Sequence, residues 1–295
     1  MSNRQKVLIT GGHGQLATDL AQVFNKADAV ALSHEQLDVS QLHDVEAALQ
    51  HYKPNMVINT AAFTDVDRCE DHVTEARSIN SGGPENLVAA AKRTNARVLQ
   101  ISTDYVFDGT LERPYIESDD TNPQSTYGRT KLEGEQAMRE QDLVVRTSWL
   151  CGSHGSNILK TIIGLAQSGH PMKFVNDQVG HPSFTRDIAV TIKQLVEIEA
   201  RGTFHVTNQG PVSWYEFAQT VLELMGRPSR QVTPITTEQL DPPRPASRPA
   251  NSVLNNKALV DIGLTPPPDF RESLPLLLKE LCDRSTGHSG DPNRR

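Results

Sequence analysis

The chain has 295 residues, enough for one large domain or for a main domain with a smaller lobe. Its formal charge is −7, from 29 Lys and Arg against 36 Asp and Glu, which argues against a dedicated nucleic-acid-binding protein. Any anionic ligand would therefore need a local basic patch.

Cysteine use and the N-terminal segment bear on the cellular compartment. Cys69, Cys151 and Cys282 are too few and too widely spaced for a disulfide framework or a metal-binding pattern, so a reducing compartment is expected. The first residues lead directly into a short apolar run, without the apolar stretch of a signal peptide or of a membrane span. We expect a cytoplasmic protein that binds neither membranes nor nucleic acid.

Apolar runs and helical patterns alternate along the first half of the chain. Short apolar runs at 7–9, 56–58, 98–101 and 143–145 are typical of buried parallel strands. Between them, 16–24 carries apolar residues at helical spacing, and 41–51, 84–93 and 128–140 have helix-forming composition. Strands that alternate with helices predict an α/β fold with a doubly wound parallel sheet.

A glycine-rich turn follows the first predicted strand and opens the first predicted helix. Gly11 suits a tight turn, Gly14 allows backbone amides to approach a pyrophosphate, and Ala17 permits close helix packing. The helix N-terminus adds unpaired N–H groups and a favourable dipole. This context predicts a Rossmann-type dinucleotide site.

The end of the second strand does not reveal which nicotinamide cofactor is used. An acidic residue there usually holds the adenosine ribose, yet the segment from Ala29 offers none before Glu35, and no arginine for a 2′-phosphate. Asp38 is a candidate for adenine contact, and equally for an acid at the start of the next helix. Both NADH and NADPH therefore remain open.

A tyrosine and a lysine four residues apart begin the helical stretch after the fourth strand. This spacing places Tyr127 and Lys131 on one helix face. A tyrosine has a pKa near 10, and a lysine one turn away stabilises its phenolate, which favours Tyr127 as the proton donor to a carbonyl oxygen. Ser102 and Thr103 end the fourth strand at the edge where open α/β sheets bind ligands, and Thr103 is expected to bond the substrate oxygen.

The composition of the chain changes after Trp149, where glycine and proline become frequent. Helical stretches at 186–199 and 213–225 are separated by turn-rich segments, and the proline-rich segment 241–249 predicts an extended loop that carries Arg244 and Arg248. We assign 1–150, with returning segments near 184–200 and 230–240, to the dinucleotide-binding domain. The remaining ranges, 151–183, 201–229 and 241–284, form a smaller C-terminal substrate-binding lobe, and 285–295 a frayed tail.

With these residues assembled, the chain resembles the extended short-chain dehydrogenase/reductases and, within them, the dTDP-4-dehydrorhamnose reductases. The resemblance covers nearly the whole chain, and STDYVFDG with RPANSVL carries most of its specificity. The matching segments are GGHGQL at 11–16, NTAAFTDVDRCE at 59–70, STDYVFDG at 102–109, YGRTK at 127–131, RTSWLCG at 146–152, NDQVGHP at 176–182, GTFHVTN at 202–208 and RPASRPANSVL at 244–254.

The resemblance implies roles for individual residues. Those that would meet the nicotinamide cofactor are Gly11, Gly14, Gln15, Leu16, Asp38, Val39, Ala62, Phe63, Thr64, Tyr127 and Lys131. Those that would face the nucleotide sugar are Thr103, Asp104, Tyr127 and Trp149, with Arg248 and Asn251 near the diphosphate. Family members can be homodimers, and some bind Mg²⁺ at that interface. The glutamate ligands cannot be placed in this sequence, so no metal ligand is assigned.

Two positions depart from the family pattern. Ala17 replaces the third glycine of the turn, which the alanine-tolerant form of the fingerprint accommodates. Cys151 stands where family members often carry tyrosine, so the contact made by that tyrosine is not carried over to this chain.

The leading functional hypothesis is NAD(P)H-dependent reduction of the 4-keto group of dTDP-4-dehydrorhamnose. A related alternative is a nucleotide-sugar 4-epimerase or 4,6-dehydratase. Dehydratases typically have two acidic residues after the threonine, whereas this chain has Asp104 and Tyr105, which argues against dehydration. A non-catalytic alternative is an NADP-binding regulatory subunit like that of methionine adenosyltransferase, because a fold alone does not fix an activity.

Overall fold

A six-stranded parallel sheet organises the larger part of the molecule. The computed structural model describes residues 6–24 and 27–287. The strands lie in the order β10-β5-β4-β3-β1-β2 and are all parallel. They are β1 (Val7–Thr10), β2 (Ala29–Leu32), β3 (Met56–Asn59), β4 (Arg97–Thr103), β5 (Leu143–Thr147) and β10 (Gly202–His205).

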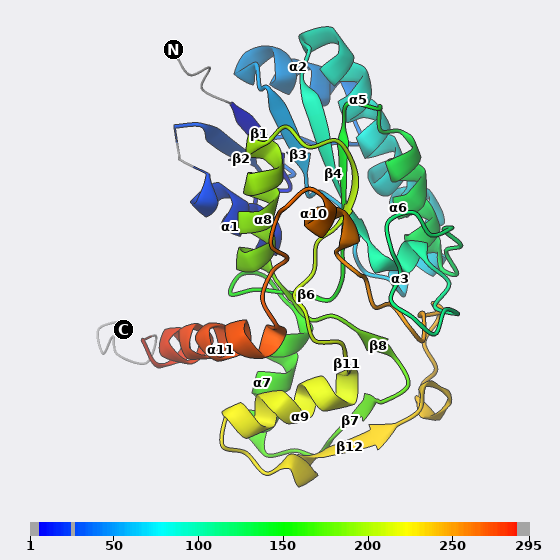
Figure 1. The fold of residues 1–295 in the computed structure, drawn as a ribbon, viewed down its shortest axis with the longest axis vertical. Coiled ribbons are helices and arrows are strands. Elements are labelled where there is room, and N and C mark those ends of the chain that lie inside the picture. Colours follow the sequence, from blue (N-terminus) through cyan, green and yellow to red (C-terminus); the bar gives the residue numbers. More distant parts are fainter. Residues whose placement is uncertain (1–5, 25–26, 288–295) are drawn as a thin grey trace, which may run out of the picture.

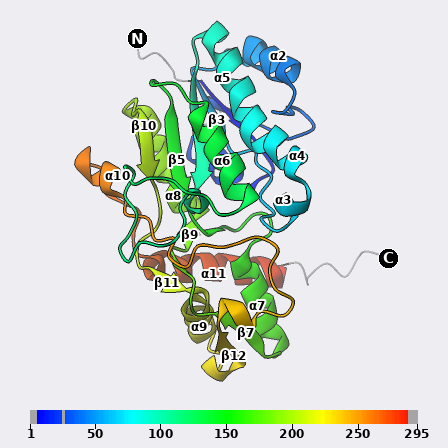
Figure 2. The same ribbon diagram turned by 90° about the vertical axis from the view of Figure 1, so that its right-hand side faces the viewer.

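Helices cover both faces of this sheet, as a doubly wound fold requires. On one face α1 (Gln15–Val23) packs against α8 (Thr185–Glu197). On the other lie α2 (Leu42–Tyr52), α5 (Gly83–Thr94) and α6 (Thr126–Gln136), the layer seen most clearly in Figure 2. Successive strand residues point to opposite faces of the sheet and pack into two hydrophobic cores. Ile9 and Ile58 pack with α1 and α8, whereas Leu8 and Val57 pack with α2 and α5. The α/β prediction is confirmed.

The strand order reverses beside β1, and this reversal positions the ligand site. The chain leaves β1 toward β2 on one side, while β3 pairs with β1 on the other, so their carboxyl ends open a crevice between the two connections. The glycine turn follows β1, and the segment after Asn59 follows β3. Both therefore meet at one edge of the sheet.

A second lobe, at the bottom of Figure 1, has a hydrophobic core of its own. Its core includes Leu159, Phe217 and Phe270, which lie on three different helices. The elements are α7 (Ile158–Ser168), α9 (Trp214–Leu224), α11 (Phe270–Gly287), β7 (Met172–Val175) paired with β12 (Val232–Ile235), β6 (Leu150–Cys151) with β9 (Ser183–Phe184), and β8 (Val179–Gly180) with β11 (Val212–Ser213). Short helices α3 (Arg68–Asp71), α4 (Val73–Arg77) and α10 (Lys257–Asp261) complete the fold.

Three of the predicted domain assignments are wrong. Residues 257–261, predicted for the lobe, form α10, which packs on β10 and places Leu259 in the core of the main sheet. Residues 202–205, predicted for the lobe, form β10 and extend the main sheet beside β5. Residues 232–235, predicted to return to the main domain, form β12 and pair with β7 in the lobe. Strand partners far apart in sequence decide both strand assignments, and local composition does not report them. The predicted tail begins inside α11, and 288–295 lie outside the described residues.

One predicted helix is shorter in the structure than its composition indicates. The helix expected over 128–140 ends at Gln136. Beyond it, the Asp142 carboxylate accepts hydrogen bonds from the Arg139 amide (3.0 Å) and from its guanidinium (2.7 Å). These bonds stabilise a turn after the helix, and β5 begins directly after Asp142.

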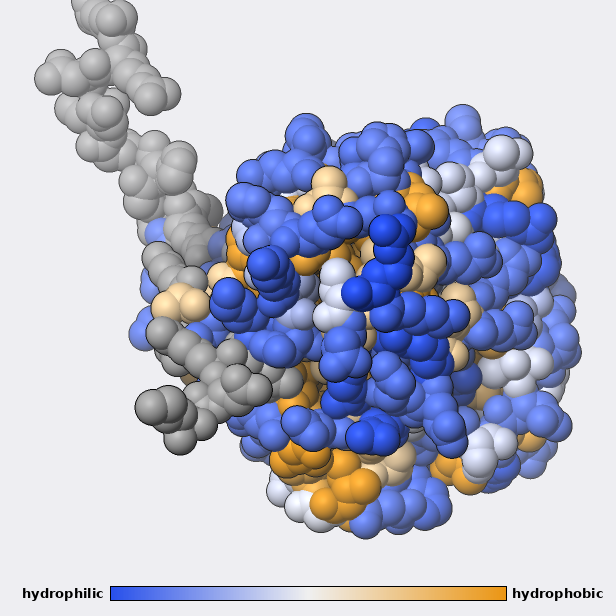
Figure 3. All heavy atoms as spheres, turned by 90° about the horizontal axis from the view of Figure 1, so that it is seen from above, coloured by the Kyte–Doolittle hydropathy of each residue, from blue (hydrophilic) through white to orange (hydrophobic). Residues whose placement is uncertain are grey.

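The surface seen from above is largely hydrophilic, with hydrophobic residues in separate small areas (Figure 3). Among the helices of the described residues, none is long and apolar enough to cross a membrane.

Candidate active site

A cavity of about 730 Å³ lies at the carboxyl ends of the central strands, between the sheet domain and the lobe. Most predicted site residues line it, although they come from segments far apart in the sequence. These are Gly11, Gly14, Gln15, Leu16, Asp38, Val39, Ala62, Thr64, Thr103, Asp104, Tyr127, Lys131 and Trp149. Phe63, Arg248 and Asn251 are not among the lining residues.

The glycine turn forms one end of the cavity. Gly11 has φ +67°, a conformation that side chains disfavour, and a Cβ atom there would lie 3.0 Å from the Ala61 amide nitrogen. Gly14 precedes α1 without a side-chain cap, and its amide donates to the Gly11 carbonyl at 2.7 Å. The first amides of α1 therefore stay available for an anion. A dinucleotide pyrophosphate fits this bare cradle, which a side chain at Gly14 would crowd.

The segment after β2 forms the side of the cavity where an adenosine would lie. Asp38 accepts hydrogen bonds from the Ser40 amide (2.9 Å) and hydroxyl (2.8 Å), so it braces the turn before α2 and also lines the cavity. Glu35 instead accepts a bond from Ser33, which lowers the pKa of the Glu35 carboxyl. Among the described lining residues the single Lys or Arg is Lys131. This end therefore shows no arginine for a 2′-phosphate.

The helix α6 sits unusually close to the elements that it covers, because two of its residues are glycines. A Cβ atom on Gly128 would collide with the Tyr105 carbonyl in the 3₁₀ turn Asp104–Val106, and one on Gly134 with the Asn80 carbonyl in the π-helical turn Ser78–Gly82. Asn80 in turn donates to Thr130 at 3.1 Å. This close approach brings Tyr127 and Lys131 to the end of β4.

The first turn of α6 is also held by a carboxylate from another helix. Glu70 on α3 accepts a bond from the Thr126 amide at 2.8 Å and another from its hydroxyl at 2.7 Å. We expect Glu70→Ala to lower the free energy of unfolding by about 1 kcal/mol, because an orphan helix donor loses its partner. Urea unfolding measures this. Glu75→Ala on α4, whose side chain is 55% exposed, is the matched control, and equal losses would contradict the capping role.

The predicted proton-transfer residues converge at the end of β4. The Tyr127 ring packs edge-on against Tyr105, with 5.6 Å between centroids. Burial raises the pKa of Tyr127 and a hydrogen bond with Thr103 opposes this rise, so the phenol keeps its proton at neutral pH. The Lys131 ammonium donates to the Ile101 carbonyl at 2.6 Å.

The buried lysine predicts a pH limit for cofactor binding. Burial lowers the pKa of Lys131 to about 8, with Glu135 opposing, so its positive charge is lost as pH rises through about 8. We expect cofactor affinity to fall above that pH, because the neutral amine no longer attracts the anionic cofactor. Fluorescence titration across pH measures this in Tyr127→Phe, where the phenol is absent. If the fall in cofactor affinity at high pH is absent from this variant, that fall is due to Tyr127 and not to Lys131.

The lobe supplies the opposite wall of the cavity through two stacked tryptophans. Trp149 has φ +45°, and its ring lies 3.5 Å from that of Trp214 with 10° between the planes. Gly180 supports the stack, since a Cβ atom there would lie 2.7 Å from the Trp149 ring. Asn157 donates to Gln15 at 2.8 Å and so joins the lobe to the glycine turn.

Two predicted substrate contacts, Arg248 and Asn251, are not brought to the cavity. Arg248 forms a two-pronged ion pair with Asp67, at 2.9 and 2.8 Å, in which Arg244 also takes part at 3.1 Å. Burial acts to raise the pKa of Asp67, but these bonds outweigh it and lower that pKa to about 2. Asn251 donates to the Leu111 carbonyl at 2.6 Å.

Phe63 and Cys151 are likewise turned toward structural neighbours. The Phe63 ring stacks on His72, and its amide donates to Asn80 at 2.9 Å. Cys151 belongs to the core of the lobe, where burial raises the pKa of its thiol to about 12. The described residues contain no group of three His, Cys, Asp or Glu placed to hold a metal ion.

Comparison with known proteins identifies the family. The model of the RmlD substrate binding domain matches residues 5–282. The chain belongs to this family. A dTDP-4-dehydrorhamnose reductase structure from Clostridium acetobutylicum superimposes with a TM-score of 0.89 at 42% identity, over 94% of this chain and 100% of that chain. The Bacillus anthracis dTDP-4-dehydrorhamnose reductase, in complex with NADP, gives 0.89 at 33% identity, over 94% and 99%. The resemblance drawn from the motifs is confirmed.

A third similar protein is named for a different substrate. The dTDP-4-keto-6-deoxy-D-glucose reductase of Streptomyces niveus is 36% identical, over 88% of this chain and 91% of its own length. Family membership therefore fixes a 4-ketoreductase of dTDP-sugars as the general class, and leaves the particular sugar to experiment.

Several lining residues escaped the sequence analysis. Trp214, His34 and Tyr105 all face the cavity, as do Gly155 and Ser156. For Trp214 a signal exists, because Ser213 and Glu216 form a capping box that starts α9 at this tryptophan. The other residues lie on connecting segments, whose path depends on the packing of the lobe against the sheet.

Proposed function

We propose that the chain reduces the 4-keto group of dTDP-4-dehydrorhamnose to give dTDP-L-rhamnose, with NADPH or NADH as cofactor. The observation that carries this proposal is one continuous cavity with the glycine cradle at one end and Thr103, Tyr127 and Lys131 at the other. Its opposite wall, the Trp149 and Trp214 stack, offers a flat apolar surface for a sugar ring.

The roles of the chain's own residues follow from their surroundings. The amides at the start of α1 and the neighbouring Gln15 and Leu16 would hold the cofactor, which supplies the hydride when bound. Tyr127 holds the proton destined for the carbonyl oxygen, since burial keeps its pKa high. Lys131, fixed by Ile101, presents its charge beside the same end of the cavity. The side-chain set is therefore that of a reductase acting on a carbonyl.

The test is a reductase assay with two sugar substrates. Purified protein receives dTDP-4-dehydrorhamnose or dTDP-4-keto-6-deoxy-D-glucose, each with NADPH and with NADH, and nicotinamide oxidation is followed. We expect the first sugar to give the higher kcat/KM and a product identified as dTDP-L-rhamnose by NMR. Preference for the second sugar would replace the proposed substrate, and turnover of neither would refute the proposed reaction.

A further inference from the structure

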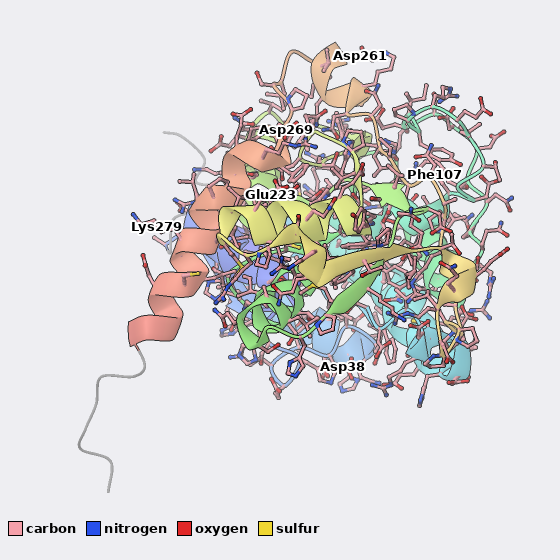
Figure 4. The ribbon with its side chains drawn as sticks, turned by 90° about the horizontal axis from the view of Figure 1, so that it is seen from below. Asp38, Phe107, Glu223, Asp261, Asp269 and Lys279 are labelled. Atoms are coloured by element: carbon pink, nitrogen blue, oxygen red, sulfur yellow. The ribbon has the colours of Figure 1, made fainter. Side chains whose placement is uncertain are left out.

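An asparagine of the lobe reaches the glycine turn of the sheet domain. Asn157 is the N-cap residue of α7, and its side-chain nitrogen donates to the Gln15 side-chain oxygen at 2.8 Å. Gln15 is the first residue of α1 and lines the cavity with Gly14, whereas Asn157 is not among the lining residues. Seen from below, α7 (green) lies next to the blue N-terminal part of the sheet domain (Figure 4). Asn157 is therefore placed to act on a ligand in the cavity through Gln15.

Two backbone groups fix which end of the Asn157 side-chain amide is the donor. The Lys160 amide donates to Asn157 Oδ1 at 3.1 Å, and Asn157 Nδ2 donates to the Gly152 carbonyl at 2.8 Å. A backbone N–H only donates and a carbonyl only accepts, so the two ends of the Asn157 amide cannot be exchanged. The Gln15 atom that meets Nδ2 must therefore accept, which makes it the oxygen and turns the Gln15 nitrogen away from Asn157.

The segment that carries Asn157 is itself held in place against Gln15. Lys160 Nζ donates to the Ser153 carbonyl at 3.0 Å and to the Gly155 carbonyl at 2.6 Å. Gly155 has φ +60°, and a Cβ atom there would lie 3.0 Å from Cγ of Gln15. The segment thus packs directly on the stem of the Gln15 side chain, while Asn157 fixes the amide at its end.

The Gln15 nitrogen is left as a donor at the anion-binding end of the cavity. Within the described part of the chain it donates to no other protein group, while the oxygen of the same amide is bound by Asn157. The single Lys or Arg among the described lining residues is Lys131, at the other end of the cavity. A pyrophosphate at the glycine turn thus meets the neutral backbone amides of α1. An N–H₂ group beside them adds a hydrogen bond to a charged oxygen, whereas an amide oxygen there would repel it.

We propose that Asn157 is a positioning residue for cofactor binding, which turns the Gln15 amide so that its N–H₂ group binds the pyrophosphate of the nicotinamide cofactor. The inference rests on the cofactor use in the proposed function. Without the Asn157 side chain, the Gln15 amide rotates freely and also presents its oxygen to the phosphates, which weakens binding. The lobe, which forms the opposite wall of the cavity, thereby contributes to the hold on the cofactor.

The test is a double-mutant cycle in which isothermal titration calorimetry measures the binding of NADPH and of NADH without sugar. Asn157→Ser keeps an oxygen that caps α7 but is too short to reach Gln15. Gln15→Met keeps the length of the side chain and loses its amide. We expect the dissociation constant to rise about fivefold in Asn157→Ser and about tenfold in Gln15→Met. The double variant should match Gln15→Met to within about 1.5-fold, because Asn157 then has no amide to orient.

A steady-state measurement separates positioning from a general disturbance of the fold. With saturating dTDP-4-dehydrorhamnose, Asn157→Ser is expected to raise the KM for the cofactor about fivefold and to keep kcat within about twofold. The reason is that Tyr127 and Lys131 lie at the other end of the cavity. Gln50→Met is the matched control, since Gln50 is exposed on α2 and does not line the cavity, and it should leave both parameters unchanged.

Two results would overturn the proposal. If Asn157→Ser weakens cofactor binding as much in the Gln15→Met background as in the wild type, Asn157 acts through its own segment and not through Gln15. If Asn157→Ser leaves the affinity unchanged, the Gln15 amide needs no partner to orient it. Because the titration contains no sugar, the cycle can fail while the wild type still reduces a keto sugar, and it can hold when no keto sugar is reduced. Failure of the inference and failure of the proposed function are therefore distinguishable.

Discussion

Tyr127→Phe is expected to lower kcat about 10³-fold, equivalent to about 4 kcal/mol in the barrier, while cofactor affinity stays within about threefold. The phenol is buried beside the end of β4 and keeps its proton at neutral pH. Phenylalanine keeps the ring that packs edge-on against Tyr105 but has no proton to give. The measurements are steady-state kinetics and fluorescence titration with cofactor.

The matched control for this change is Tyr52→Phe. Tyr52 ends α2, packs against the core and does not line the cavity, so the loss of its hydroxyl should leave kcat unchanged. If Tyr127→Phe retained full turnover, another group would have to deliver the proton, and the proposed mechanism would be wrong.

Gly128→Ala is expected to destabilise the protein by about 3 kcal/mol and to lower kcat roughly 10²-fold. The added Cβ atom would collide with the Tyr105 carbonyl, which belongs to the backbone of a tight turn and has little room to move. The helix must therefore shift away from β4, which carries the adjacent Tyr127 off its position. Thermal or urea unfolding measures the first effect, and steady-state kinetics the second.

Gly164 offers the same substitution in a helix with open space around it. No atom lies within 4 Å of the position that its Cβ would take, so Gly164→Ala is expected to stabilise the protein by about 0.4–1 kcal/mol. A loss of similar size in both variants would show that close packing of α6 is not what Gly128 provides.

The central sheet was predictable because its signals are local. Val7, Leu8 and Ile9 are consecutive, buried and followed at once by the glycine turn, and the apolar run at 56–58 is likewise consecutive and buried. In a parallel sheet covered on both faces, a strand needs apolar residues in both directions, and a short window displays this. The order of strands around β1 then places the crevice.

The edges of the fold were not predictable in the same way. The strand at 202–205 has a glycine, a threonine and a histidine in four positions, so nothing in its composition marks it as part of the main sheet. Its place follows from pairing with β5, some sixty residues earlier in the chain. β12, which contains Pro234, is defined by its pairing with β7.

In the candidate site, residue type could be read from the sequence but pairing could not. The spacing of Tyr127 and Lys131 fixed their shared helix face, and both line the cavity. The family resemblance placed Arg248 near the diphosphate, yet in the structure it pairs with a carboxylate, Asp67, from a segment 181 residues away. Trp149 was expected at the sugar. Its stacking partner Trp214 was not predicted, because their contact depends on how the lobe folds.

The stacked indoles have a spectroscopic consequence. Trp149 and Trp214 are the chain's two tryptophans, and they lie face to face at 3.5 Å on the cavity wall. Their transitions should therefore couple and give a strong near-ultraviolet circular dichroism signal, which Trp214→Phe would remove. All indole emission also originates beside the ligand, so a reduced nicotinamide should quench it by energy transfer. The protein thus carries its own optical reporter of cofactor arrival, without any label.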